Sequence, residues 1–211
     1  FPKERYESIN VFMRQMTLHQ VINAFDTDIH KKIILLCKRM PLYFIDRAFL
    51  KKYSQPDKKL SWIFLLVSSE LDAIAHAVCC GETLCNQDAF DAAKAYIEKD
   101  GKMPLFITGA GGQGKTVLMM ELAKYFSEKD YPVFWISIGR SSSSKGYIQE
   151  FVELLDEVSA VYRKKVLLML DNPYADLDYV EEIYHAVNYE MHPIQVIVTE
   201  RTNRLDYLFA D

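Results

Sequence analysis

The chain has 211 residues, 50% of them hydrophobic and 26% charged, which is the composition of a globular protein rather than a disordered one. Its formal net charge of −4 provides no general attraction to nucleic acid or to anionic lipid, so a nucleic-acid partner is not indicated. The longest apolar runs, residues 33–37 and 62–67, are far shorter than the roughly 20 residues that cross a membrane, so no membrane segment is expected.

The first 95 residues have the apolar spacing of helices and contain no catalytic constellation. Apolar side chains recur at helical intervals from Ile9 to Phe25. The same spacing predicts four further helices, at residues 29–37, 44–53, 60–80 and 88–99. The pattern therefore predicts an all-helical N-terminal region, residues 1–95, whose role the sequence does not reveal.

From residue 103 the pattern changes to strands that alternate with helices. Strands are predicted at residues 105–108, 133–138, 166–170 and 194–199. Amphipathic helices are predicted between them, at residues 115–128, 147–162 and 177–189. This alternation implies right-handed crossovers and a parallel sheet between two helical layers, so an α/β domain is expected over residues 96–211.

A Gly-rich loop between the first of these strands and its helix matches the pattern G-x-x-x-x-G-K-[ST]. Glycine lets the loop wrap closely around a phosphate with its backbone N–H groups pointing inward. Lys115 is placed to reach the β and γ phosphates, the Thr116 hydroxyl to bind Mg²⁺, and the helix to point its positive end at the same group. We expect ATP or ADP to contact nine residues here: Gly109, Ala110, Gly111, Gly112, Gln113, Gly114, Lys115, Thr116 and Val117.

Two later strands end in residues that complete such a site. The apolar run at residues 166–170 ends in Asp171, a carboxylate that would orient Mg²⁺ together with Thr116. The strand at residues 194–199 leads into Glu200 and Arg201, and a cation at that point would lie beside the γ-phosphate. The candidate catalytic residues are therefore Lys115, Asp171, Arg201 and Glu200, with Arg204 as a second choice for the cation.

With these features, the sequence resembles the STAND class of signal-transduction ATPases, relatives of the AAA+ proteins that include NACHT and NB-ARC modules. The resemblance covers about residues 90–211 and includes a turn, Thr199-Glu200-Arg201, similar to the Thr-x-Arg turn of that class. It implies a three-layer P-loop NTPase fold. It also implies that exchange of ADP for ATP turns a closed monomer into an oligomer that activates an attached effector, often in antiviral defence or immunity.

One departure from the class bears on hydrolysis. Asn172 follows Asp171 where further acids are usual, and an amide cannot act as a general base. Glu200, Asp176 or Glu121 would have to polarise the attacking water. We therefore expect a weak, slow ATPase, or binding without turnover.

The surroundings of this core lead to two further expectations. The chain starts at Phe1 rather than Met and lacks the lid and repeat sensor of the class, which predicts a fragment of a longer protein. Its four cysteines, Cys37, Cys79, Cys80 and Cys85, show no disulfide framework, and the cytoplasm is the expected compartment. In the complete protein we expect self-association or an effector domain as the partner.

Two alternative functions remain open. A small-molecule P-loop kinase or phosphotransferase would need a mobile, Arg-rich lid near the γ-phosphate. The segment between the second predicted strand (residues 133–138) and Asp171 offers only Arg140 and Arg163. Alternatively, the helical first part is the functional domain, an adaptor that binds a partner, and the nucleotide site has only a structural role.

Overall fold

The computed structural model describes residues 18–54, 70–83, 85–99, 103–138, 146–189 and 193–202. Three of the features predicted above lie wholly or partly outside these ranges. They are the helical pattern before residue 18, most of the helix at residues 60–80, and the two arginines Arg140 and Arg204.

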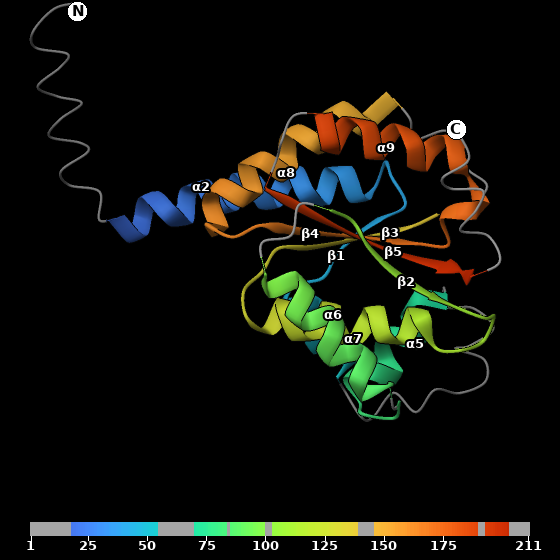
Figure 1. The fold of residues 1–211 in the computed structure, drawn as a ribbon. Coiled ribbons are helices and arrows are strands. Elements are labelled where there is room, and N and C mark those ends of the chain that lie inside the picture. Colours follow the sequence, from blue (N-terminus) through green and yellow to red (C-terminus); the bar gives the residue numbers. More distant parts are fainter. Residues whose placement is uncertain are drawn as a thin grey trace, which may run out of the picture.

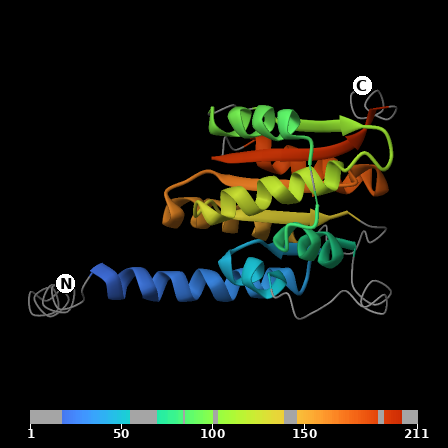
Figure 2. The ribbon, with the colours of Figure 1, turned by 90° about the horizontal axis from the view of Figure 1, so that it is seen from below.

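The centre of the described part is a five-stranded sheet with the order β1-β3-β4-β5-β2 (Figures 1 and 2). Its strands are β1 (Leu42–Phe44), β2 (Leu105–Gly109), β3 (Val133–Ser137), β4 (Val166–Asp171) and β5 (Ile194–Arg201). The pairs β3–β4, β4–β5 and β2–β5 are all parallel. The predicted α/β fold of the P-loop NTPase type is confirmed.

The structure corrects one detail of the region that the sequence predicts to be all-helical. Residues 42–44 form β1, which pairs antiparallel with β3 so that Leu42 lies opposite Ile136. The helix predicted at residues 44–53 begins only at Arg47, as α3 (Arg47–Tyr53), because Asp46 caps it by accepting a hydrogen bond from Phe49 N at 2.7 Å. The N-terminal region therefore contributes an edge strand to the sheet.

Helices cover both faces of the sheet, which is the middle of three layers (Figure 1). One face carries α2 (Leu18–Cys37), α8 (Ile148–Tyr162) and α9 (Leu177–Tyr189). The other face carries α3, α5 (Glu70–Cys79), α6 (Gln87–Glu98) and α7 (Lys115–Glu128). The bounds of α7 and α9 agree with the predicted helices.

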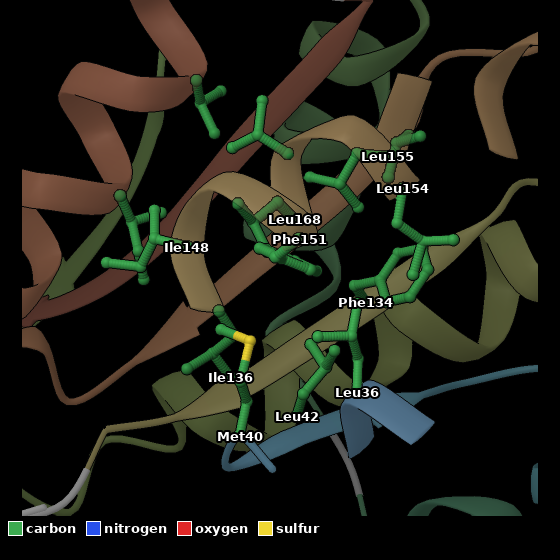
Figure 3. Close-up of a cluster of buried hydrophobic side chains, with 14 of the residues drawn as sticks. Leu36, Met40, Leu42, Phe134, Ile136, Ile148, Phe151, Leu154, Leu155 and Leu168 are labelled. Atoms are coloured by element: carbon green, nitrogen blue, oxygen red, sulfur yellow. The ribbon is translucent and has the colours of Figure 1, made fainter. Parts of the chain in front are cut away.

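The buried side chains form two clusters because successive residues of each strand point to opposite faces. Leu168 faces the cluster beneath α8, where Figure 3 shows it near Phe134 and Phe151. Its neighbours Leu167 and Met169 face the cluster beneath α7. Burial on both faces explains why β4 is an unbroken apolar run up to its last residue.

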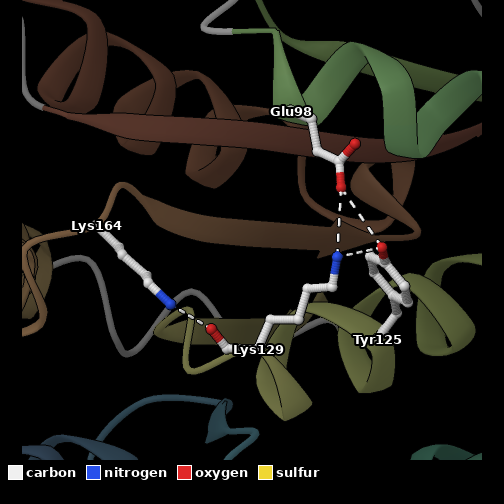
Figure 4. A network of polar contacts seen from close by, with 4 residues as sticks. All are labelled: Glu98, Tyr125, Lys129 and Lys164. Carbon is white, nitrogen blue, oxygen red and sulfur yellow. Dashed lines mark hydrogen bonds and ion pairs between the residues drawn. The ribbon is translucent and has the colours of Figure 1, made fainter.

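A polar network joins three elements at the amino ends of the strands, away from the Gly-rich loop (Figure 4). Lys129, just after α7, places its Nζ atom 3.6 Å from Glu98 Oε1 of α6 and donates a hydrogen bond to the Tyr125 hydroxyl. Lys164, in the turn before β4, donates to the Lys129 carbonyl. The Lys129 and Glu98 side chains are about half exposed, so their ion pair is expected to contribute little to stability.

The N-terminal segment packs against the rest of the fold. In α2, Lys32 forms an ion pair with Glu157 of α8 at 2.7 Å, and Ile33 and Leu36 lie in the cluster beneath α8. The division into a domain of residues 1–95 and one of residues 96–211 stays a prediction. Among the described residues, every helix is too short or too polar to cross a membrane.

Candidate functional site

The Gly-rich loop connects β2 to α7 at the carboxyl end of the parallel strands. Gly112 and Gly114 both have φ of 77°, in the left-handed region that side-chain-bearing residues rarely adopt. Gly114 is also the N-cap of α7, which begins at Lys115. The loop therefore faces the unpaired N–H groups and the positive end of a helix, the arrangement that binds phosphate groups.

The side chain of Lys115, the first residue of α7, reaches back over the Gly-rich loop that precedes it. Its Nζ atom donates hydrogen bonds to the carbonyls of Gly109 at 3.0 Å and Ala110 at 2.7 Å. These bonds hold the ammonium charge beside the loop, where it can also attract a polyphosphate.

A group of oxygen atoms lies where α7 begins and where β4 and β5 end. Asp171 Oδ1 accepts a hydrogen bond from the Thr116 hydroxyl at 3.2 Å and another from the Thr199 hydroxyl at 2.5 Å. Thr199 Oγ1 in turn accepts a hydrogen bond from the backbone N–H of Asn172 at 3.4 Å. The carboxylate and the Thr116 hydroxyl are oxygen ligands of the kind that Mg²⁺ prefers, with water and phosphate supplying the remainder. Thr116 and Asp171 thus fit the predicted Mg²⁺ site.

Thr199 is a residue that the sequence analysis did not place in the site. It ends β5's apolar run, pairs with Ile107 of β2 in the register of the sheet, and binds the Asp171 carboxylate. The signal that could have identified it is a hydroxyl residue at the end of an otherwise apolar buried strand.

Arg201 reaches the Gly-rich loop from the end of β5, where it pairs with Gly109. A Cβ atom added to Gly111 would lie 3.6 Å from the Arg201 Cζ atom and 3.8 Å from Nη2. The guanidinium therefore lies against the loop, where it can approach a bound phosphate.

Glu200 is not brought together with the other candidates. Strand alternation points its side chain to the face of Val196 and Val198, opposite to the face of Thr199 and Arg201. The side chain is only 3% exposed, and its Oε1 atom accepts a hydrogen bond from Arg201 N at 2.6 Å. This geometry gives no support to the prediction that Glu200 polarises an attacking water.

The other two acids considered for that role are engaged elsewhere. Asp176 accepts a hydrogen bond from Tyr179 N at 3.2 Å, at the start of α9. Glu121 accepts one from the Thr83 hydroxyl at 3.3 Å. Asn172, directly after Asp171, has left-handed backbone angles and supplies only an amide side chain. The hydrogen bonds of Asp176 and Glu121 therefore give no support to a role for either as the base.

A hollow of about 740 Å³ adjoins the loop on the side of α6. Its walls are the N-cap residue Asn86, α6 with Ala89 and Tyr96, the strand β2, and the start of α7. The loop residues Gln113, Gly114 and Lys115 line it as well, so it is continuous with the phosphate site. Its volume lies within the range of roughly 300–1,000 Å³ that small-molecule sites occupy. The sequence analysis did not predict this hollow. The row of alanines on α6 that faces β2 is the feature of the sequence that could have indicated it.

Comparison with known proteins gives a family match over more than half of the chain. The family described as Novel STAND NTPase 5 matches residues 83–210. A search of curated proteins finds no match.

Solved structures with a similar arrangement include PCH-2 from C. elegans, at 13% identity and a TM-score of 0.39, over 76% of this chain and 43% of that one. Trip13 from Rhizobiales gives 17% identity and a TM-score of 0.37, over 78% of this chain and 63% of the other. The HORMA:CdnC:Trip13 complex of E. coli MS115-1 gives 12% identity and a TM-score of 0.39, over 79% of this chain and 65% of the matched chain. This chain thus spans less than two thirds of the length of each of these structures.

Proposed function

Because this chain belongs to the Novel STAND NTPase 5 family, it is a nucleotide-binding NTPase module, and we propose that it is an ATP-dependent regulatory switch. In this proposal the module binds ATP and ADP with Mg²⁺ and hydrolyses ATP slowly. Its nucleotide state controls self-association of the complete protein and the activity of an attached effector, in signalling or antiviral defence.

The observation that supports nucleotide binding best is the convergence of three separate segments at one end of the sheet. The Gly-rich loop brings Lys115, β4 brings Asp171 and β5 brings Arg201. One ammonium, one guanidinium and one carboxylate with a hydroxyl match the charges of a triphosphate and its Mg²⁺. The adjoining hollow offers space for the nucleoside part.

Slow hydrolysis follows from the acids around the site. The residue after Asp171 is an amide, and Glu200, Asp176 and Glu121 accept hydrogen bonds from Arg201 N, Tyr179 N and the Thr83 hydroxyl. In this proposal none of these described acids orients the attacking water well, so bound ATP persists long enough to act as a signal. We expect a turnover number well below about 1 s⁻¹, the lower end of the range for ordinary enzymes.

The compartment belongs to the same proposal. We propose the cytoplasm, because the four cysteines lack the spacing of a disulfide framework.

Nucleotide binding is tested by titration calorimetry of ATP and ADP with Mg²⁺, comparing the wild type with Lys115→Ala. Loss of a charge-assisted contact to phosphate should weaken ATP binding by about 10- to 100-fold. Lys129→Ala is the matched control, because Lys129 follows the other end of the same helix and should leave the affinity unchanged. A folded wild type that binds neither nucleotide would refute the proposal.

The switch is tested separately by light scattering of the full-length protein, loaded with ADP or with ATP. We expect a larger species with ATP than with ADP. The same species in both states would exclude control of assembly by nucleotide. Rapid phosphoryl transfer to a small molecule would favour a kinase instead.

A further inference from the structure

The side chain of Gln113 folds back over the loop that contains it. Its Oε1 atom accepts a hydrogen bond from Ala110 N at 2.8 Å, and its own backbone N–H donates to the Ala110 carbonyl at 3.4 Å. The same carbonyl accepts the hydrogen bond from Lys115 Nζ. The Ala110 N–H and carbonyl, near the start of the loop, are thus both bound by residues near its end.

Gly109 provides the space that this contact needs. A Cβ atom added there would lie 2.6 Å from Gln113 Oε1, closer than real Cβ atoms approach other heavy atoms. Gly112 and Gly114 differ, because an added Cβ meets nothing within 4 Å and only their positive φ disfavours other residues. The loop therefore has glycines for two distinct reasons.

We propose that Gln113 is a positioning residue, which holds the loop in its phosphate-binding curve before nucleotide arrives. Because Gly109 has no Cβ atom, the Gln113 amide oxygen has room to reach Ala110 N. This inference rests on the proposed function, since the ligand of the loop is a nucleoside polyphosphate.

The physical basis is the cost of ordering a flexible loop. A segment rich in glycine loses much conformational freedom when it closes around a ligand, and contacts that order it beforehand reduce that loss on binding. The Gln113 oxygen binds the N–H of Ala110, near the start of the loop, whereas the N-cap of α7 has no side-chain hydrogen bond. The positive end of α7 would bind the phosphate.

The first test replaces Gln113 with methionine, which has similar length and no comparable acceptor. Removal of one hydrogen bond should weaken both ATP and ADP binding about three- to tenfold in calorimetry. Hydrogen exchange at the Ala110 amide should accelerate by a similar factor, and the melting temperature should stay close to that of the wild type. A Gln113→Met protein with wild-type affinity would overturn the inference.

A double-mutant cycle with Gly109 gives a sharper test. In the wild-type background Gly109→Ala should weaken nucleotide binding about three- to tenfold, as Gln113→Met does, because the new methyl group displaces the Gln113 side chain and so removes the same hydrogen bond. In a Gln113→Ala background the same change should weaken nucleotide binding less than about twofold, because the side-chain oxygen that it would displace is already absent. Gly112→Ala is the control. Its effect on nucleotide affinity comes from the positive φ of Gly112, so it should be equal in the two backgrounds.

Equal cost of Gly109→Ala in the two backgrounds would overturn the inference while leaving the proposed function intact. A wild type that binds no nucleotide would instead refute the proposed function. In that case the exchange rate of the Ala110 amide still decides whether Gln113 orders the loop.

Discussion

A single carboxylate connects the three segments of the candidate site. Asp171 Oδ1 receives hydrogen bonds from the hydroxyls of Thr116 and Thr199, which lie on α7 and β5. These bonds determine where the carboxylate points, and hence where Mg²⁺ and the phosphates would lie. Thr199 is bonded on its other side to Asn172 N, so it also links the end of β4 to β5.

Replacement of Thr199 by valine keeps the shape of the side chain and removes its hydroxyl. Loss of a hydrogen bond to a charged group should weaken Mg²⁺–ATP binding about tenfold. Binding in EDTA should change much less, because the hydroxyl acts through Asp171. The comparison is made by calorimetry with and without Mg²⁺.

Thr83→Val is the matched control, since it removes a hydroxyl bonded to Glu121 rather than to Asp171. An equal loss of affinity in both variants would contradict a specific role for Thr199.

The rate at which Cys37, at the end of α2, is alkylated is expected to depend on pH in a way that reports its burial. Burial raises the pKa of its thiol from the ordinary 9.0 to about 11. At pH 8 its thiolate should thus be on the order of 100-fold rarer than that of an unperturbed cysteine, with alkylation slower to match. Pulsed iodoacetamide labelling read by mass spectrometry measures this rate, with urea-unfolded protein as the control.

The sign of the linked stability change follows from the raised pKa. The folded state holds the Cys37 proton more tightly than the unfolded chain, so this contribution to stability is complete below about pH 9 and is lost as the pH rises towards 11. Alkylation of the folded protein at the rate of the unfolded control would contradict burial of this thiol.

At the scale of elements, the antiparallel strand β1 is the part that sequence patterns did not predict. Three residues cannot show a period of two, and Pro41 and the helical flanks favoured a different interpretation. The strand forms because Leu42 and Phe44 find partners on β3, a contact between segments far apart in the chain. In contrast, α7 and α9 are long enough for their apolar spacing to mark both ends.

The importance of β1 is tested by Leu42→Ala. Leu42 is 3% exposed within the cluster beneath α8, so its truncation should lower the free energy of unfolding by roughly 2–5 kcal/mol. Leu35→Ala is the control, because Leu35 is 44% exposed and should cost less than about 0.5 kcal/mol. Urea denaturation followed by circular dichroism measures both. A Leu42→Ala protein as stable as the control would show that β1 is dispensable for the sheet.

At the scale of the whole molecule, the two buried clusters share one sheet, and β3 and β4 contribute side chains to both. A change that disrupts one cluster therefore also destabilises the strands that hold the other cluster. The described part of the chain is expected to unfold in a single cooperative transition.

Nucleotide should stabilise this unit through its affinity for the folded state alone. At a free ATP concentration of 100 times Kd the gain is about 2.7 kcal/mol, which corresponds to a rise in Tm of roughly 5–10 °C for a chain of this size. Thermal denaturation with Mg²⁺–ATP measures the shift, and Lys115→Ala, in which ATP binding is weakened about 10- to 100-fold, should remove about half of it or more. A shift of equal size in that variant would show that the stabilising ligand binds elsewhere.

The sequence by itself determined the order of strands and helices after residue 103, the place of the Gly-rich loop between a strand and a helix, and the place of Asp171 at the end of a strand. These follow from local causes: apolar periodicity, the backbone freedom of glycine and the end of a buried strand. Only the tertiary structure decided that Thr199 binds Asp171, that Glu200 points to the opposite face, and that β1 joins the sheet. The Thr199 contact and the place of β1 depend on which strands pair and in what register. Alternation along β5 puts Glu200 opposite to Thr199, but only the assembled sheet decides which of the two faces meets the Gly-rich loop.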